Sequence, residues 1–189
     1  MKTPTRKEEI IVVASQLFKE KGYTAISMRD IAKAMGMKAA SLYNHISSKQ
    51  EILSTLILRV AHEFINGMNQ VTSQSFSPIQ KITAVIELHI DITVNNSEAI
   101  AALNNDWMHL EAEIEYYMKH RKNYEIDFRG IIEERIQGSE LINGNPEVML
   151  FSLLSTLRSL YIWLPKKEDL DIEKFTTELS LVLINGINK

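Results

Sequence analysis

Three adjacent side chains that can hydrogen-bond or stack, Tyr43, Asn44 and His45, stand within the segment GMKAASLYNHISSKQEIL at residues 36–53. In an enzyme such a cluster could supply a general acid or base, and in a DNA-binding protein it could form an edge that enters a groove. In a purely structural role, Tyr43 would pack, Asn44 would end a helix and His45 would be solvated. The elements around the triplet decide between these interpretations.

The segment before the triplet has the pattern of a short helix followed by a tight turn. Ser27 with Asp30 three residues later predicts an N-cap for the helix MRDIAKAM, which should end at Gly36. Ile31 and Ala32 would pack inward from this helix, and the glycine would permit the turn.

A second short helix is predicted over about residues 38–45, with Leu42 and Ile46 as apolar anchors. The two short helices together form a helix-turn-helix, whose free face can enter a major groove. Three small residues on the second helix would let its backbone approach DNA closely: Ala39, Ala40 and Ser41.

Helical periodicity extends over the rest of the chain, which predicts an all-α fold. The segment RKEEIIVVASQLFKEKGY should form a helix that begins near Arg6 and ends at Gly22. Ser48 with Glu51 matches a capping box that starts a helix reaching about residue 72. We expect a three-helix helix-turn-helix domain at residues 1–50 and a second helical domain at residues 51–189.

Further helix starts are marked by Ser77-Pro78 and Asn145-Pro146, each a capping residue followed by proline at the first helical position. Between them the pattern predicts helices near residues 78–95 and 98–105, and then one of about thirty residues from Trp107 onward. Two strongly apolar helices should complete the chain.

Composition favours a cytoplasmic protein with a basic N-terminal part. There is no cysteine, the N-terminus lacks the apolar core of a signal peptide, and no run approaches the roughly 20 apolar residues of a membrane span. Residues 1–50 contain nine basic and four acidic residues, a net charge of +5, so the remainder carries −8 of the total of −3. This asymmetry suggests that the N-terminal part meets a polyanion.

The stretch from Arg6 to Leu53 resembles the DNA-binding domain of the TetR family of transcriptional regulators. The family pattern appears as Leu42-Tyr43-Asn44-His45-Ile46 followed by Ser48-Lys49-Gln50-Glu51-Ile52-Leu53, and the match covers about a quarter of the chain. Ile46 replaces the usual aromatic residue. Lys38 stands where a capping Ser or Thr is common, which could weaken the helix cap or add a phosphate contact.

The resemblance implies a role for each matching position on DNA. Tyr43, His45 and Lys49 would bind phosphates, and Asn44 is suited to adenine. Ser27 and Arg29 would contact the backbone or a neighbouring base. The remaining residues expected to face base edges are Lys38, Ala39, Ala40 and Ser41.

The family also implies a homodimer whose last two long helices form a four-helix bundle with those of the partner. Apolar residues on these helices offer more surface than one domain easily buries, which supports a dimer independently. They are Leu150, Leu153, Leu154, Leu157, Tyr161, Leu179, Val182 and Leu183.

The expected effector is a small apolar or amphipathic molecule, because aromatic and methionine side chains suit an adaptable pocket. The candidate contacts are Trp107, Tyr117, Met118, Arg121, Tyr124 and Trp163. Arg121 could bind an anionic head group or pair with Glu125 four residues on. Similarity to family members that respond to acyl-CoA thioesters favours a fatty acyl-CoA, and planar cationic drugs are the competing class.

The sequence thus predicts a ligand-responsive regulator, most simply a repressor, that binds double-stranded operator DNA as a homodimer without cofactor, metal or membrane. Two alternatives stay open: an all-helical ligand-binding or metal-dependent enzyme with a vestigial helix-turn-helix, and a protein that binds DNA only with a partner. For the metal, His109 and Glu113 stand four residues apart and His89 might approach them. No phosphate-binding glycine loop, Gly-x-Ser-x-Gly elbow or His-Glu-x-x-His motif supports catalysis.

Overall fold

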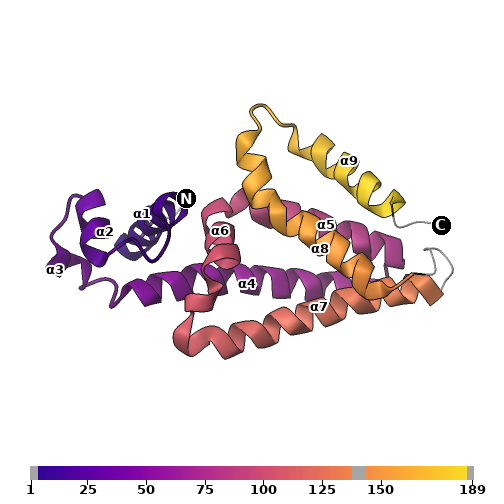
Figure 1. The fold of residues 1–189 in the computed structure, drawn as a ribbon, viewed down its shortest axis with the longest axis horizontal. Coiled ribbons are helices and arrows are strands. Elements are labelled where there is room, and N and C mark those ends of the chain that lie inside the picture. Colours follow the sequence, from indigo (N-terminus) through magenta and orange to yellow (C-terminus); the bar gives the residue numbers. More distant parts are fainter. Residues whose placement is uncertain (1–3, 138–143, 187–189) are drawn as a thin grey trace. The chain divides into compact units, whose positions relative to one another are not determined.

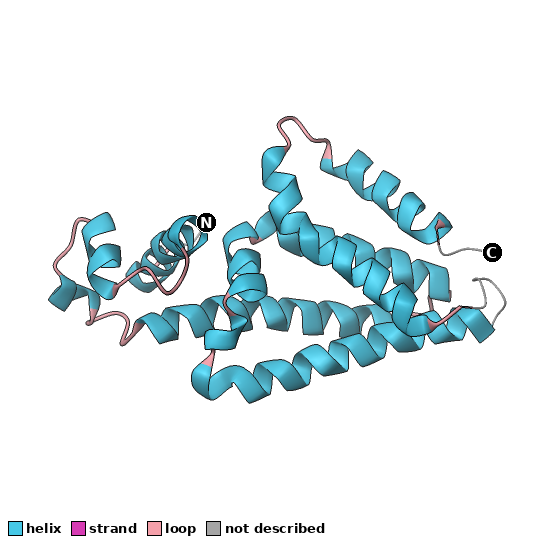
Figure 2. Ribbon diagram, viewed as in Figure 1, coloured by secondary structure: helices cyan, strands magenta, loops and turns pink. Residues whose placement is uncertain are grey.

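The computed structural model describes residues 4–137 and 144–186, and these residues contain helices and no strands (Figures 1 and 2). The first four helices are α1 (Arg6–Lys21), α2 (Met28–Ala34), α3 (Ala39–Leu42) and α4 (Lys49–Ser73). They are followed by α5 (Pro78–Asn95), α6 (Ser97–Asn105), α7 (Ile114–Gln137), α8 (Pro146–Trp163) and α9 (Ile172–Asn185). Short 3-10 turns, η1 (Trp107–His109), η2 (Glu111–Glu113) and η3 (Leu164–Lys166), lie before α7 and after α8. The all-α prediction is confirmed.

The chain forms two compact units, and the first combines two separate stretches of sequence. Unit 1 contains Met1–Val60 and Asn96–Tyr117, and unit 2 contains Ala61–Asn95 and Met118–Lys189. Within unit 1, α6 packs against α1 and α2 packs against both α1 and α3. The expected functional division at residue 50 stays a prediction, because compactness does not report which residues bind DNA or effector.

Side-chain caps define the start of each helix that leads to the turn. The hydroxyl of Thr5 caps α1 in a reciprocal capping box with Glu8, and Ser27 caps α2 in the same way with Asp30. The chain then turns at Gly22 and Gly36, whose φ angles of 83° and 63° are the left-handed values that glycine tolerates best.

Two helices differ from their predicted bounds. The recognition helix α3 ends at Leu42, so the Tyr43-Asn44-His45 triplet lies beyond it, in a turn closed by the His45 N–H bond to the Leu42 carbonyl at 3.0 Å. At its start Lys38 provides no side-chain cap, as its type suggests.

The predicted thirty-residue helix from Trp107 is wrong, because α7 begins only at Ile114. Two 3-10 turns precede it, and Glu111, the first residue of the second turn, has a φ of 41°, which interrupts the helical path. Leu110, fully buried between these turns, anchors the irregular segment in unit 1.

The core of unit 2 is built around α5, which packs against both α8 and α9. Ile82, Ile86 and Phe128 are fully buried there. Leu153 and Leu157 of α8 belong to this core, and so do Leu150 and Leu154, so these four leucines are not the unburied surface expected for a dimer interface. An α-helical stripe alone does not distinguish an internal from an intermolecular apolar face.

One segment of the described chain, Pro146–Lys166, is long and apolar enough to cross a membrane by length and composition, contrary to the sequence prediction. It consists of α8 and η3, and α8 contributes Leu153 and Leu157 to the core of unit 2. Helices in a protein core can have the same length and composition, so these two properties alone do not assign a membrane span.

Candidate nucleic-acid interface

Four buried apolar side chains anchor the helix-turn-helix. Ile31 and Leu42 are fully buried, and Ala32 and Ile46 are nearly so. The predicted anchors are therefore confirmed, and the isoleucine in place of the usual aromatic residue is accommodated in the core.

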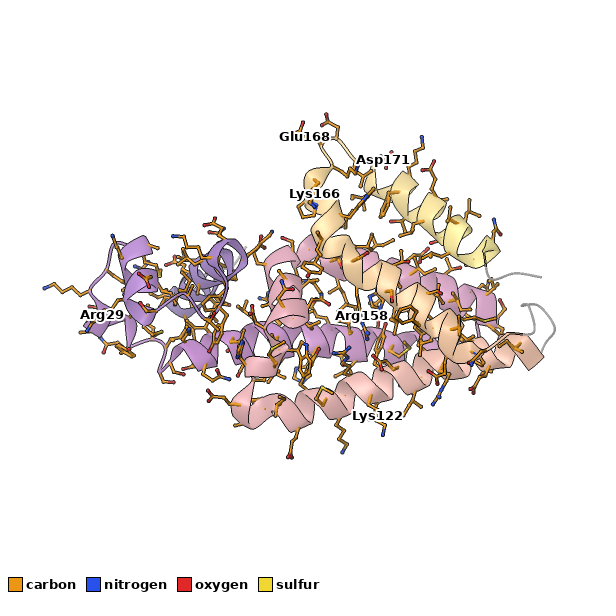
Figure 3. The ribbon with its side chains drawn as sticks, in the orientation of Figure 1. Arg29, Lys122, Arg158, Lys166, Glu168 and Asp171 are labelled. Atoms are coloured by element: carbon orange, nitrogen blue, oxygen red, sulfur yellow. The ribbon has the colours of Figure 1, made fainter. Side chains whose placement is uncertain are left out.

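The outer edge of the helix-turn-helix carries most of the predicted DNA-binding residues. Tyr43 is 54% exposed, and Asn44 and His45 are exposed beside it. Arg29, labelled in Figure 3, is exposed on α2. The other exposed candidates are Ser27, Lys38 and Ala40, whereas Ala39, Ser41 and Lys49 are half-buried.

Ser27 is engaged in the cap of its own helix. Its hydroxyl donates to Asp30 Oδ2 at 2.5 Å and accepts the Asp30 N–H at 3.3 Å. These bonds to Ser27 hold the pKa of the Asp30 carboxyl below its usual value. The cap thus fixes the first turn of α2, from which Arg29 extends.

The capping box expected at the start of α4 is only half formed. The Ser48 hydroxyl accepts the Glu51 N–H at 3.0 Å, but the Glu51 carboxylate turns to Ser47, where it accepts the backbone N–H and the hydroxyl, each at 2.7 Å. Lys7 of α1 donates to the same carboxylate at 2.5 Å. These bonds, the Lys7 bond foremost, lower the pKa of Glu51 to about 2.

Tyr23, buried in the turn between α1 and α2, contacts several residues of unit 1. Its hydroxyl donates to Gln50 Oε1 at 2.8 Å, and Gln50 Nε2 donates to the His109 carbonyl at 2.6 Å. The Tyr23 and His109 rings stack with centroids 5.4 Å apart. Lys49 Nζ donates to the Tyr23 carbonyl and lies over the same ring. The first turn of α4 is thus joined to η1 through one tyrosine.

The predicted metal set is not brought together. His109 stacks on Tyr23 in unit 1, and His89 lies in unit 2, where its Nε2 is 2.9 Å from the Tyr124 hydroxyl. Among the described residues, no group of three or more His, Cys, Asp or Glu is placed to hold a metal ion.

The six predicted effector contacts are divided between the two units. Trp107 and Tyr117 belong to unit 1, where their rings lie 6.0 Å apart and Tyr117 is buried. The other four belong to unit 2: Met118, Arg121, Tyr124 and Trp163. Trp163, 41% exposed, stacks on Phe175 with a centroid distance of 5.2 Å.

A polar group not foreseen as a unit lies between α7 and α8. Arg158 Nη2 contacts Glu125 Oε1 at 2.5 Å, and Arg121 Nε contacts the same oxygen at 3.4 Å, so two arginines share one carboxylate (Figure 3 labels Arg158). Beside it, burial and the Arg158 charge lower the pKa of His89 to about 3. Only the i,i+4 spacing of Arg121 and Glu125 was visible in the sequence, and the ion pair, one of the two roles considered for Arg121, is present.

These features define a helical protein with an anchored helix-turn-helix and a second helical unit. Residues 10–56 match the model of bacterial regulatory proteins of the tetR family, and residues 75–187 match a tetracyclin repressor-like C-terminal domain. The chain belongs to the TetR family of transcriptional regulators.

Relatives and solved structures agree with this assignment. The fatty acid metabolism regulator protein of Bacillus subtilis is 21% identical over 185 residues, which cover 95% of this chain and 94% of that protein. Three other curated relatives are one helix-turn-helix transcriptional activator and two helix-turn-helix transcriptional repressors. The chain spans about half the length of these proteins, 48% to 52%.

Two solved structures show the same fold. The ketosteroid transcriptional regulator KstR2 of Mycobacterium tuberculosis has a TM-score of 0.91 at 16% identity, covering 100% of this chain and 97% of that one. AibR, solved in complex with isovaleryl coenzyme A and operator DNA, has a TM-score of 0.78 at 22% identity, covering 95% of this chain and 98% of that one.

Proposed function

We propose that the chain is a ligand-responsive repressor that binds double-stranded operator DNA in the cytoplasm and is released by a small molecule, without enzymatic activity. The observation that carries this proposal is the exposed edge of Tyr43, Asn44 and His45 on a helix-turn-helix whose anchors Leu42 and Ile46 are buried. The buried anchors hold this edge, which we call the reading edge, in place. Its exposed polar groups remain available for bases and phosphates. Residues 1–50 would read DNA, and residues 51–189 would sense the effector and dimerise.

On DNA, Tyr43 and His45 contact phosphates, and Asn44 reads a base edge, with adenine the best match for its amide. Arg29 and Lys38, both exposed, add contacts from the two sides of the turn. Ala40, also exposed, permits close approach, with Ala39 and Ser41 beside it. Ser27 contributes a backbone contact in addition to its cap.

The working form is a homodimer formed through α8 and α9. Phe151 and Val148 of α8 are 72% and 60% exposed, and Val182 and Leu181 of α9 are 67% and 55% exposed. Large apolar side chains left in water on two neighbouring helices of the sequence favour burial against a second copy. Two-fold symmetry then presents two reading edges to half-sites about 34 Å apart.

The effector is an apolar or amphipathic molecule, and a fatty acyl-CoA is the first candidate. Support comes from the name of the Bacillus relative and from the isovaleryl coenzyme A in the solved complex of AibR. Binding would favour a conformation in which the reading edges no longer fit successive major grooves. The six residues expected from the sequence to contact the effector are the positions to mutate first.

Fluorescence anisotropy of the purified protein tests this function. The duplex upstream of its own gene is compared with a scrambled duplex at near-physiological salt, because nonspecific affinity falls steeply with salt. We expect a preference of about 10³ or more for the first duplex, and its loss on adding an acyl-CoA. Equal binding to both duplexes, with and without acyl-CoAs and cationic drugs, would argue against the proposal.

A further inference from the structure

The Lys49 ammonium, at the first residue of α4, is occupied by groups of its own chain. Its Nζ donates to the Tyr23 carbonyl and to the Ile26 carbonyl, each at 2.8 Å, and lies 4.1 Å from the centroid of the Tyr23 ring. The carbonyls use two of its three N–H donors, and the aromatic face covers a further side of the ammonium. A DNA phosphate would have to displace one of these contacts.

The carbonyls of Tyr23 and Ile26 lie directly before the first helix of the helix-turn-helix. Tyr23 and Ile26 are buried in the turn between α1 and α2, and Ile26 directly precedes Ser27, the N-cap of α2. Lys49 therefore ties the first turn of α4 to the peptide from which α2 starts. All of these groups lie in unit 1, as does Gln50, which continues the connection to the His109 carbonyl.

We infer that Lys49 is a positioning residue that fixes α2 and α3 against the first turn of α4, rather than a phosphate ligand as the family resemblance implies. This inference rests on the proposed DNA-binding function, because positioning matters only if the edge reads DNA. A misplaced edge loses its fit to a specific sequence, whereas nonspecific attraction to phosphates survives.

The surroundings of Lys49 agree with a structural contact. Its side chain is half-buried, and this burial lowers the pKa of the ammonium while the Asp106 carboxylate raises it. Lys38, by contrast, is exposed at the start of the recognition helix. The two lysines therefore make a matched pair, one held by carbonyls and one facing solvent.

The salt dependence of DNA binding separates the two roles. Each phosphate neutralised by a lysine adds about 0.9 to the slope of log affinity against log salt, because counterions are released. Lys49→Met keeps an unbranched apolar side chain but removes the N–H donors. It is compared with Lys38→Met and with Lys21→Met, which removes an exposed charge at the end of α1, on the own-gene and scrambled duplexes at several salt concentrations.

For Lys49→Met we expect the wild-type salt slope on both duplexes, a loss of about tenfold or more in affinity for the own-gene duplex, and a change below about threefold on the scrambled one. Lys38→Met should lower the slope by about 1. Lys21→Met should match the wild type. A Lys49→Met protein whose slope falls by about 1, with both duplexes weakened equally, would overturn the inference.

A second measurement needs no variant and covers a Lys49→Met protein that fails to fold. An ammonium held by carbonyls exchanges slowly, so NMR of the lysine side-chain nitrogens should show the Lys49 signal in the free full-length chain, unmoved by the scrambled duplex. A signal that appears or shifts only with DNA contradicts the inference. If the wild type shows no preference for its own-gene duplex, the proposed function fails. The salt slope of binding to the scrambled duplex and the NMR signal of Lys49 would still test whether Lys49 is a positioning residue.

Discussion

Tyr43, Asn44 and His45 are adjacent and exposed, but their chemistry separates their roles on DNA. A phenol and an imidazole reach phosphates that are the same in every sequence, whereas an amide can donate and accept at one base edge. The turn after α3 presents all three without using them in the core. Their contributions should therefore be separable by single substitutions.

Tyr43→Ala should weaken binding to the own-gene and scrambled duplexes alike. Asn44→Ala should act mainly on the own-gene duplex, with a loss of about 1–3 kcal/mol, because a bidentate contact carries sequence information. Anisotropy titrations of both variants at one salt concentration measure the difference. If Asn44→Ala weakens the two duplexes equally, Asn44 does not read a base.

His89 is a buried neutral histidine, and its protonation should work against folding. Burial, followed by the Arg158 charge, lowers its pKa to about 3 from an ordinary 6.5. Between these values the unfolded chain binds a proton that the folded chain does not, so the stability is complete above pH 6.5 and declines as pH falls towards 3. The decline should approach about 1.4 kcal/mol per pH unit.

The His89→Gln variant tests this dependence. Glutamine can keep a hydrogen bond to the Tyr124 hydroxyl but does not titrate. Urea unfolding of both proteins between pH 6 and 4 should show a smaller loss of unfolding free energy in the variant, by about one proton's slope. Identical pH profiles for the two proteins would show that His89 is not kept neutral by the fold.

At the scale of elements, capping and periodicity made α1, α2, α4 and α5 predictable. Ser27 and Ser48 lie where a side chain meets the free N–H groups of a helix, and this local chemistry can be read from the sequence. The start of α7 could not be predicted, because the periodic pattern continues through η1 and η2. There the path follows tertiary contacts, such as the Gln50 bond to the His109 carbonyl.

The candidate site was predictable to the same extent. The anchors Leu42 and Ile46 are buried as predicted, whereas the exposed triplet lies beyond α3 and not on it, and its role on DNA stays a prediction. The partners of Lys49 and Gln50 could not be predicted, because Tyr23 and His109 lie 26 and 59 residues away in the sequence. Residue type suggests which groups can bind, and only the fold determines which are already occupied.

Two helical glycines should respond oppositely to alanine. A Cβ at Gly130 of α7 meets nothing within 4 Å, so Gly130→Ala should raise the unfolding free energy by about 0.5–1 kcal/mol through reduced backbone freedom. A Cβ at Gly67 of α4 would lie 2.4 Å from Leu88 Cδ1, so Gly67→Ala should lower it by about 1 kcal/mol or more. Urea unfolding of both variants provides the comparison, and a stabilised Gly67→Ala protein would show that Leu88 moves freely.

For the whole molecule, the dimer should depend on the exposed apolar faces of α8 and α9. Phe151→Asp places a charge on the most exposed of these side chains and should shift the protein from dimer to monomer in sedimentation velocity. Ile126→Asp, at a 45% exposed position of α7, is the matched control and should remain dimeric. Dimerisation that survives Phe151→Asp unchanged would place the interface elsewhere.

The helix α9 buries only Ser180 fully, and its apolar residues Leu181 and Val182 remain largely exposed. If the proposed dimer forms through α9, the second copy covers these side chains, and diluting the protein should loosen α9 first. Amide hydrogen exchange in α9 would then speed up as the protein concentration falls, while exchange in the buried α5 would not. The stability of this regulator would then depend on the concentration at which the cell maintains it.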